Sequence, residues 1–303
     1  PKYTSPPTPR PAPNREKSPA ALWQINAAQR IVFIEVYFGT SGQIGPCATH
    51  HFRSHGPVSG IDFPGPPGNP SRYAAGMSKA ASGAITLVVF CRRPALGSGK
   101  RRLARELGDP ATLTISELLL ATTLEDVAAW PGRRVIAPAE PGDASWARSL
   151  PVPLDDVVPQ RNGNLGVRLA GVDRVLRGRG HTRFLYIGSD SPVLGPADYR
   201  AARQALATHD VVLGPALDGG VTCLGSRQPW PELASLPWGG EELHAALQAI
   251  CARGGLTVQN LPPRYDVDVP ADLRRLCSDL AGDARPARRA LYRALRSLGY
   301  SGS

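Results

Sequence analysis

Cysteine pairs with metal-binding or disulfide spacing are missing from this 303-residue sequence. Its five cysteines are odd in number and lie far apart, without a C-x-x-C pair, which argues against a disulfide scaffold and against a cysteine-based zinc site. Long apolar runs are missing too, because no stretch approaches the roughly 18 residues that suggest a membrane span. We therefore expect a reduced, cytoplasmic protein with no membrane span.

Aromatic residues are scarce, at 6 % of the chain, whereas hydrophobic residues make up 42 % and suffice for a sizeable core. Basic residues outnumber acidic ones and give a formal net charge of +10, which suits an anionic ligand such as a nucleotide or a phosphate. The sequence contains no nucleic-acid-binding motif, and few aromatic residues lie between its basic ones. We therefore expect no nucleic-acid partner.

Residues 1–76 differ in composition from the rest of the chain. They contain 13 of the 31 prolines, which cannot continue a helix or a central strand. Only residues 29–38 have the composition of a strand, and nothing nearby is expected to pair with them. We predict that residues 1–76 are a disordered extension, that their three histidines lie in a solvated loop, and that the working protein begins at Met77 as one domain over residues 77–303.

The remaining residues alternate between strand and helix patterns. Apolar, β-branched stretches predict strands, and apolar residues at helical spacing predict helices between them. The strands are expected at 84–91, 133–137, 183–188, 210–213 and 256–261, with an antiparallel return at 221–225. The helices are expected at 115–130, 164–176, 196–207, 241–251, 270–280 and 286–298. This order predicts a Rossmann-like α/β fold, a mostly parallel sheet with helices on both faces.

A basic, glycine-rich loop follows the first predicted strand of this domain. Ligands of open α/β sheets bind outside the carboxyl ends of the strands, and glycines let a backbone approach a ligand closely. The loop is no Walker A motif, because Pro94 stands at the first glycine position. We predict that it binds phosphate, through Arg92, Pro94, Gly97, Gly99, Lys100 and Arg102.

Aspartates follow three later strands. Asp190, in I-G-S-D-S-P, ends a buried strand and could hold a divalent cation beside a diphosphate, because Mg²⁺ needs only one or two carboxylates in addition to phosphate and water. Asp218 lies in an Asp-Gly-Gly turn, and Asp266 and Asp268 precede a helix. The residues alone leave open whether these aspartates bind a metal or only cap helices and shape turns.

The order of these motifs resembles the DUF2064 family, whose members are assigned as glycosyltransferases. The resemblance consists of a strand followed by a G-x-G-K-x-R-L-like loop, then I-G-S-D-S-P, then D-V-V-L-G-P-x-x-D-G-G, then D-V-D-x-P-x-D-L. It covers roughly residues 85–276. It implies a GT-A fold, that of the nucleotide-diphospho-sugar transferases, and a reaction between a nucleotide-diphospho-sugar donor and a small-molecule acceptor.

The resemblance also implies roles for individual residues. The loop around Lys100 would bind the nucleotide, and Asp190 would bind Mg²⁺ or Mn²⁺, with Asp268 completing the metal site. Asp190 and Asp218 are the predicted catalytic residues. An inverting enzyme needs a base for the acceptor hydroxyl, and Asp218 is a candidate for that base by its position alone. The substrate side would be shaped by Gly219, Gly220 and Trp238.

Some positions depart from the family pattern. Asn164 and Val167 stand where the family tends to have acids, and Gly239 and Gly240 replace two hydroxyl residues. Two alternatives remain beside glycosyl transfer, and the departures favour the second of them. One is a nucleotidyltransferase of the same fold, similar to guanylyltransferases. The other is a nucleotide-binding protein that has lost its catalytic activity.

Overall fold

The computed structural model describes residues 20–25, 31–36 and 84–301. The chain divides into two compact units, Pro1–Gly68 and Asn69–Ser303. In the first unit, β1 (Ala20–Ile25) pairs antiparallel with β2 (Ile31–Val36). The strand predicted at 29–38 is thus confirmed, but the expectation that nothing nearby pairs with it is wrong. β1 was missed because Ile25 is its only β-branched residue.

The other predictions for the leading segment concern residues outside the described ones. These are the disorder of the remaining residues up to 76, the loop with three histidines, and the beginning at Met77. They stay predictions.

The second unit is built on a seven-stranded sheet of order β5-β4-β3-β6-β8-β7-β9. β8 runs antiparallel to both neighbours, and all other pairs are parallel, so the mostly parallel sheet and its antiparallel return are confirmed. The strands are β3 (Thr86–Cys91), β4 (Arg134–Pro138), β5 (Asp156–Val157), β6 (Phe184–Gly188), β7 (Val211–Pro215), β8 (Val221–Ser226) and β9 (Val258–Asn260).

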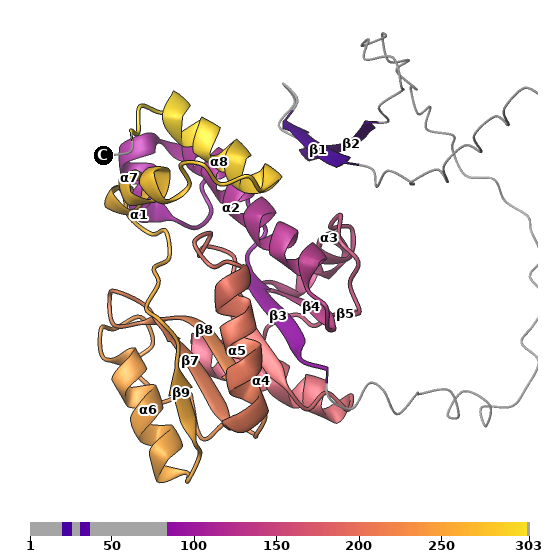
Figure 1. Cartoon of the computed structure of the whole chain (residues 1–303), viewed down its shortest axis with the longest axis vertical. Helices are drawn as coiled ribbons and strands as arrows, with labels where there is room; N and C mark the ends of the chain where they lie inside the picture. The colour runs from indigo at the N-terminus through magenta and orange to yellow at the C-terminus, as the bar shows by residue number, and fades with distance from the viewer. Residues whose placement is uncertain (1–19, 26–30, 37–83, 302–303) are drawn as a thin grey trace, which may run out of the picture. The chain divides into compact units, whose positions relative to one another are not determined.

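Helices cover both faces of the sheet, as predicted (Figure 1). Successive side chains of a strand point to opposite faces, so Leu87 and Val89 of β3 pack into one core and Val88 packs into the other. The helices are α1 (Arg101–Leu107), α2 (Asp109–Ala129), α3 (Ala144–Arg148), α4 (Leu165–Gly178), α5 (Pro196–Thr208), α6 (Leu243–Arg253), α7 (Pro270–Asp279) and α8 (Pro286–Ser297). The first core includes residues of α2, α3 and α5, and the second includes residues of α4 and α6.

A third core joins α1, the first half of α2, α7 and α8, which gather at one end of α2 in Figure 1. Sequence patterns missed α1 and began α2 six residues late. Gly108, with φ of +76°, ends α1, and Pro110 then occupies the first turn of α2, where its missing N–H costs nothing. Elements as short as α3 and β5 carry no periodic pattern that could have predicted them.

Within the part of the second unit that the structure describes, no helix combines the length and the apolar composition that crossing a membrane requires.

We expect that deleting residues 1–76 leaves the second unit folded. Its three cores are built from residues between Ile85 and Tyr300, so the deletion removes none of this packing. Thermal unfolding followed by circular dichroism should remain cooperative, with a change in melting temperature below about 2 °C. Loss of the cooperative transition would show that the leading segment is structural.

Candidate functional site

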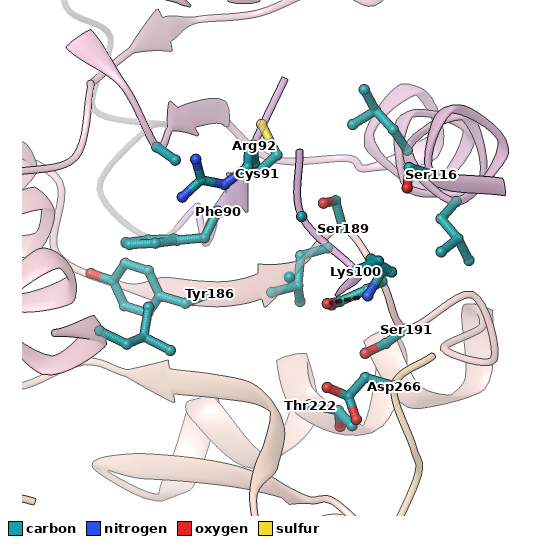
Figure 2. A pocket seen from close by; sticks show the side chains of 18 of the residues that line it. Phe90, Cys91, Arg92, Lys100, Ser116, Tyr186, Ser189, Ser191, Thr222 and Asp266 are labelled. Atoms are coloured by element: carbon teal, nitrogen blue, oxygen red, sulfur yellow. Dashed lines mark hydrogen bonds and ion pairs between the residues drawn. The ribbon is translucent and has the colours of Figure 1, made fainter. Parts of the chain in front are cut away.

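The topology leaves a crevice between the carboxyl ends of β3 and β6. From β3 the chain proceeds to β4 on one side, and it later returns to β6 on the other side. Loops leave the two central strands in opposite directions at such a switch point, and ligands bind there. A cavity of about 480 Å³ opens at this place, lined by the segments that follow β3 and β6 (Figure 2).

The loop after β3 has an unusual backbone. Gly97 and Gly99 both adopt φ of +71°, and Lys100 adopts φ of 38°, the only positive φ of a non-glycine residue among those described. Lys100 then serves as the N-terminal cap of α1. Of the six predicted phosphate-binding residues, four line the cavity, and Gly97 and Arg102 do not. The lining ones are Arg92, Pro94, Gly99 and Lys100.

Lys100 connects three segments that are distant in the sequence. Its ammonium Nζ lies 3.2 Å from Asp190 Oδ2 and donates a hydrogen bond of 2.5 Å to the carbonyl oxygen of Val267. The N–H of Val267 in turn donates to the carbonyl oxygen of Asp190 over 2.9 Å. The loop after β3, the end of β6 and the segment before α7 are thereby held at one point.

Three aspartates line the cavity around this point, Asp190, Asp266 and Asp268. The pKa of Asp266 is raised from its ordinary value of 3.8 to about 6, first by burial and then by the negative charges of Asp190 and Asp218, while Lys100 opposes the rise. Asp268 is different, because its exposed carboxylate forms an ion pair of 2.8 Å with Arg102.

Asp266 was quoted in the sequence motif but was not among the predicted site residues. The family resemblance implied a metal-binding role for Asp268, two positions later, and none for Asp266. No residue pattern reports the burial and the neighbouring charges that raise the pKa of Asp266, because both arise from segments far away in the sequence. The tertiary structure is therefore what identifies Asp266 as a candidate functional group.

The carboxylates of the cavity are too few to hold a metal ion by themselves. They are better suited to a cation that is also bound by the phosphates of a ligand. No group of three His, Cys, Asp or Glu side chains among the described residues is arranged to hold a metal ion. Asp190 lies in the cavity beside a basic loop, however, and Mg²⁺ typically takes one or two carboxylates and completes its shell with phosphate oxygens and water. The predicted ligand pair of Asp190 and Asp268 stays a prediction.

The residues predicted on the substrate side do not line this cavity. Asp218 Oδ1 accepts a hydrogen bond of 3.0 Å from the N–H of Gly220 across the β7–β8 turn. Gly219 has φ of +85°, and a Cβ there would lie 1.9 Å from the backbone oxygen of Glu241. Trp238 donates its indole N–H to the carbonyl oxygen of a neighbouring loop residue over 2.7 Å. Their predicted roles stay predictions.

The segment that departs from the family pattern contributes to the site in another way. Asn164 caps α4, because its side-chain oxygen accepts a hydrogen bond of 3.0 Å from the N–H of Val167. Gln160 and Arg168 both line the cavity, and Arg168 Nη1 donates a hydrogen bond of 3.4 Å to Gln160 Oε1. Neither residue was among the predicted site residues, although both lie within four residues of Asn164.

The end of the cavity away from Lys100 is more apolar. Figure 2 shows Phe90 and Tyr186 there, opposite Lys100 and Asp266. The two aromatic rings meet edge to face with centroids 6.1 Å apart. The hydroxyl of Tyr186 donates to Asp173 over 2.7 Å, so this residue presents its ring to the cavity. A ligand could thus place charged groups at one end and an apolar part at the other.

Comparison with solved structures establishes the fold. A provisionally named nucleotide-diphospho-sugar transferase from Desulfovibrio desulfuricans is 23 % identical, with a TM-score of 0.64 over 71 % of this chain and 95 % of its own. Two other similar structures have TM-scores below 0.5. Rv0371c from Mycobacterium tuberculosis is 25 % identical over 64 % of this chain and 97 % of its own, with a TM-score of 0.41. A cytidylyltransferase from Leptospira borgpetersenii is 12 % identical over 71 % and 95 %, with a TM-score of 0.44.

Sequence comparison gives one further match. No curated protein matches the chain. The model of the family described as "Uncharacterized protein conserved in bacteria (DUF2064)" matches residues 123–240, a region that contains I-G-S-D-S-P and the Asp-Gly-Gly turn. The predicted resemblance is therefore confirmed over residues 123–240, whereas the loop with Lys100 and the D-V-D-x-P-x-D-L motif lie outside the match. The chain has the fold of a nucleotide-diphospho-sugar transferase.

Proposed function

We propose that the protein is a glycosyltransferase that uses a nucleotide-diphospho-sugar donor, a divalent cation and a small-molecule acceptor. The observation that carries the proposal is the junction of Lys100 with Asp190 and Val267 inside a cavity at the switch point of the sheet. It supports the proposal because a cationic group and several carboxylates line one cavity, and a donor diphosphate with its cation requires both kinds of group. The family resemblance and the fold agree with this assignment.

The departing diphosphate is the group whose charge such a site must stabilise. Lys100 and Arg92 supply positive charge from the loop after β3, and preorganised charges of this kind lower the barrier most where negative charge develops. Asp190 would hold Mg²⁺ or Mn²⁺, which would neutralise the phosphates from the opposite side. The apolar end of the cavity, formed by Phe90 and Tyr186, would hold a less polar part of the ligand.

An acceptor hydroxyl must lose a proton during the transfer. Asp218 is the base expected from its position in the sequence, but it is exposed and lies outside the cavity lining. Asp266 lines the cavity, and its pKa of about 6 suits a base that works near neutral pH. We therefore favour Asp266 as the base and keep Asp218 as the second candidate.

We expect Asp190→Asn to abolish the metal dependence of nucleotide binding and to leave the fold intact. Asparagine caps helices and turns almost as well as aspartate, so a merely structural Asp190 would tolerate the change. Calorimetric titration with the four common nucleoside diphosphates, with and without Mn²⁺, measures the effect. Asp143→Asn is a matched control, because Asp143 is paired with Arg93 and does not line the cavity. Metal-dependent binding that persists in Asp190→Asn would refute the proposed role.

The reaction products separate glycosyl transfer from its alternatives. A glycosyltransferase releases a nucleoside diphosphate from the donor sugar, whereas a nucleotidyltransferase releases pyrophosphate from a nucleoside triphosphate. Binding without turnover of either donor would identify a nucleotide-binding protein without catalytic activity. Chromatography of the products from a donor panel with Mn²⁺ decides between the three.

A further inference from the structure

The ammonium group of Lys100 lies beside a carboxylate oxygen of Asp190, the proposed ligand of the divalent cation. Nζ is 3.2 Å from Asp190 Oδ2, and the Lys100 side chain is only 15 % exposed while that of Asp190 is 37 % exposed. The same Nζ is fixed by the carbonyl oxygen of Val267. A side chain held by two bonds from two different segments has a defined position, not that of a solvated surface lysine.

The backbone of Lys100 supports this position. A non-glycine residue in the left-handed region bears a cost of roughly 1 kcal/mol, and Lys100 does so at φ of 38° and ψ of 43°. The conformation occurs directly after Gly99, at the start of α1. From this position the side chain reaches Asp190 and the carbonyl oxygen of Val267.

We infer that, before the donor binds, the ammonium group of Lys100 occupies the place beside Asp190 that the divalent cation would take. The phosphates of the donor then attract Lys100 and leave this place to the cation. The inference rests on the proposed function, since it concerns the same cation and donor. In the free protein the ammonium neutralises Asp190 and repels a free divalent ion. A bound diphosphate offers Lys100 a stronger partner, which releases the carboxylate of Asp190 to the cation that accompanies the donor.

Two consequences follow for the order of binding. Free Mn²⁺ should bind weakly to the unliganded protein, and Mn²⁺ together with a nucleoside diphosphate should bind well. Lys100 would therefore ensure that the cation and the donor enter as one complex. Asp268 differs in this respect. Its ion pair with Arg102 is exposed, so water and ions can replace Arg102 beside its carboxylate.

The test compares Lys100→Gln with wild type in calorimetric titrations with Mn²⁺ alone, with nucleoside diphosphates alone and with both. We expect Lys100→Gln to bind Mn²⁺ alone about tenfold more tightly, because the competing charge is gone. The same variant should bind nucleoside diphosphates more weakly, because it has lost a phosphate partner. Lys100→Arg, which keeps the charge, should exclude Mn²⁺ as wild type does.

Arg101→Gln is the matched control. It removes the same charge from the neighbouring position, where the side chain is exposed, and its Mn²⁺ affinity should stay within about twofold of wild type. Unchanged Mn²⁺ affinity in Lys100→Gln, while wild type binds diphosphate with Mn²⁺, would overturn the inference alone. Failure of wild type to bind any nucleoside diphosphate with Mn²⁺ would overturn the proposed function too.

Discussion

Arg288→Ala is expected to lower the free energy of unfolding by about 3–5 kcal/mol, the range for removing one partner of a buried ion pair. The Arg288 side chain is completely buried in α8. Its guanidinium lies 2.9 Å from Glu125 Oε2 and 2.7 Å from Asp126 Oδ2, both in α2. Alanine would remove a fully buried cation from two largely buried carboxylates. Asp126 would keep a longer ion pair of 3.4 Å with Arg285. Glu125 would keep the hydrogen bond from the N–H of Ala287.

The same guanidinium also supports the candidate site. It donates to the carbonyl oxygens of Pro192 and Leu194, over 2.9 and 2.8 Å, in the loop after β6 that contains Asp190. The C-terminal helix thus fixes the segment that carries the proposed metal ligand. We therefore expect the loss of Arg288 to weaken nucleotide binding even under conditions where the variant remains folded.

Urea denaturation followed by circular dichroism measures the change. Arg289→Ala is the control, since it removes the next arginine of the same helix from an exposed position and should change the free energy of unfolding by less than about 0.5 kcal/mol. Equal stability of the two variants would show that the buried ion pairs contribute nothing beyond ordinary surface charge.

The sequence predicted the helix that bears Arg288 but not the role of the residue. The helix was predicted at 286–298 from apolar residues at helical spacing, and α8 is observed at Pro286–Ser297. Arg288 stands three and seven residues before Leu291 and Leu295, on the buried face. An arginine on that face requires acidic partners, and these lie about 160 residues away in α2. Local patterns cannot identify partners at such a separation.

The candidate site was predictable to a similar extent. Reasoning from strand ends placed Lys100 and Asp190 at one edge of the sheet, and both line one cavity. It could not predict that the two side chains touch, nor that Asp266 has the most perturbed carboxyl of the site. The roles of Asp218 and Trp238 rested on family position alone, and their observed contacts lie within a turn and a neighbouring loop.

Asp266→Asn is expected to stabilise the metal-free protein by about 1–2 kcal/mol at neutral pH. The wild-type carboxyl has a pKa of about 6 in the folded protein, against an ordinary value of 3.8. Two pKa units correspond to nearly 3 kcal/mol, and the expected value is smaller because the side chain is partly exposed to solvent. Asparagine has nearly the shape of the acid and never ionises, so it avoids this cost.

The pH dependence follows from the direction of the shift. Between pH 4 and 6 the folded protein holds a proton on Asp266 that the unfolded chain has released, so the stability of wild type falls as pH rises through this range. The advantage of Asp266→Asn should therefore be close to zero below pH 4, grow between pH 4 and 6, and stay constant above pH 7.

Thermal and urea unfolding at pH 4 and pH 7.5, in buffer with a chelator, measure this difference. Asp268→Asn is the matched control, because its exposed carboxylate is already paired with Arg102 and should give no such gain. The stabilised Asp266→Asn variant should also lose glycosyl transfer if Asp266 is the base, since asparagine cannot accept the proton. A stability gain that is equal at both pH values would contradict the raised pKa. A stable variant with full activity would return the role of base to Asp218.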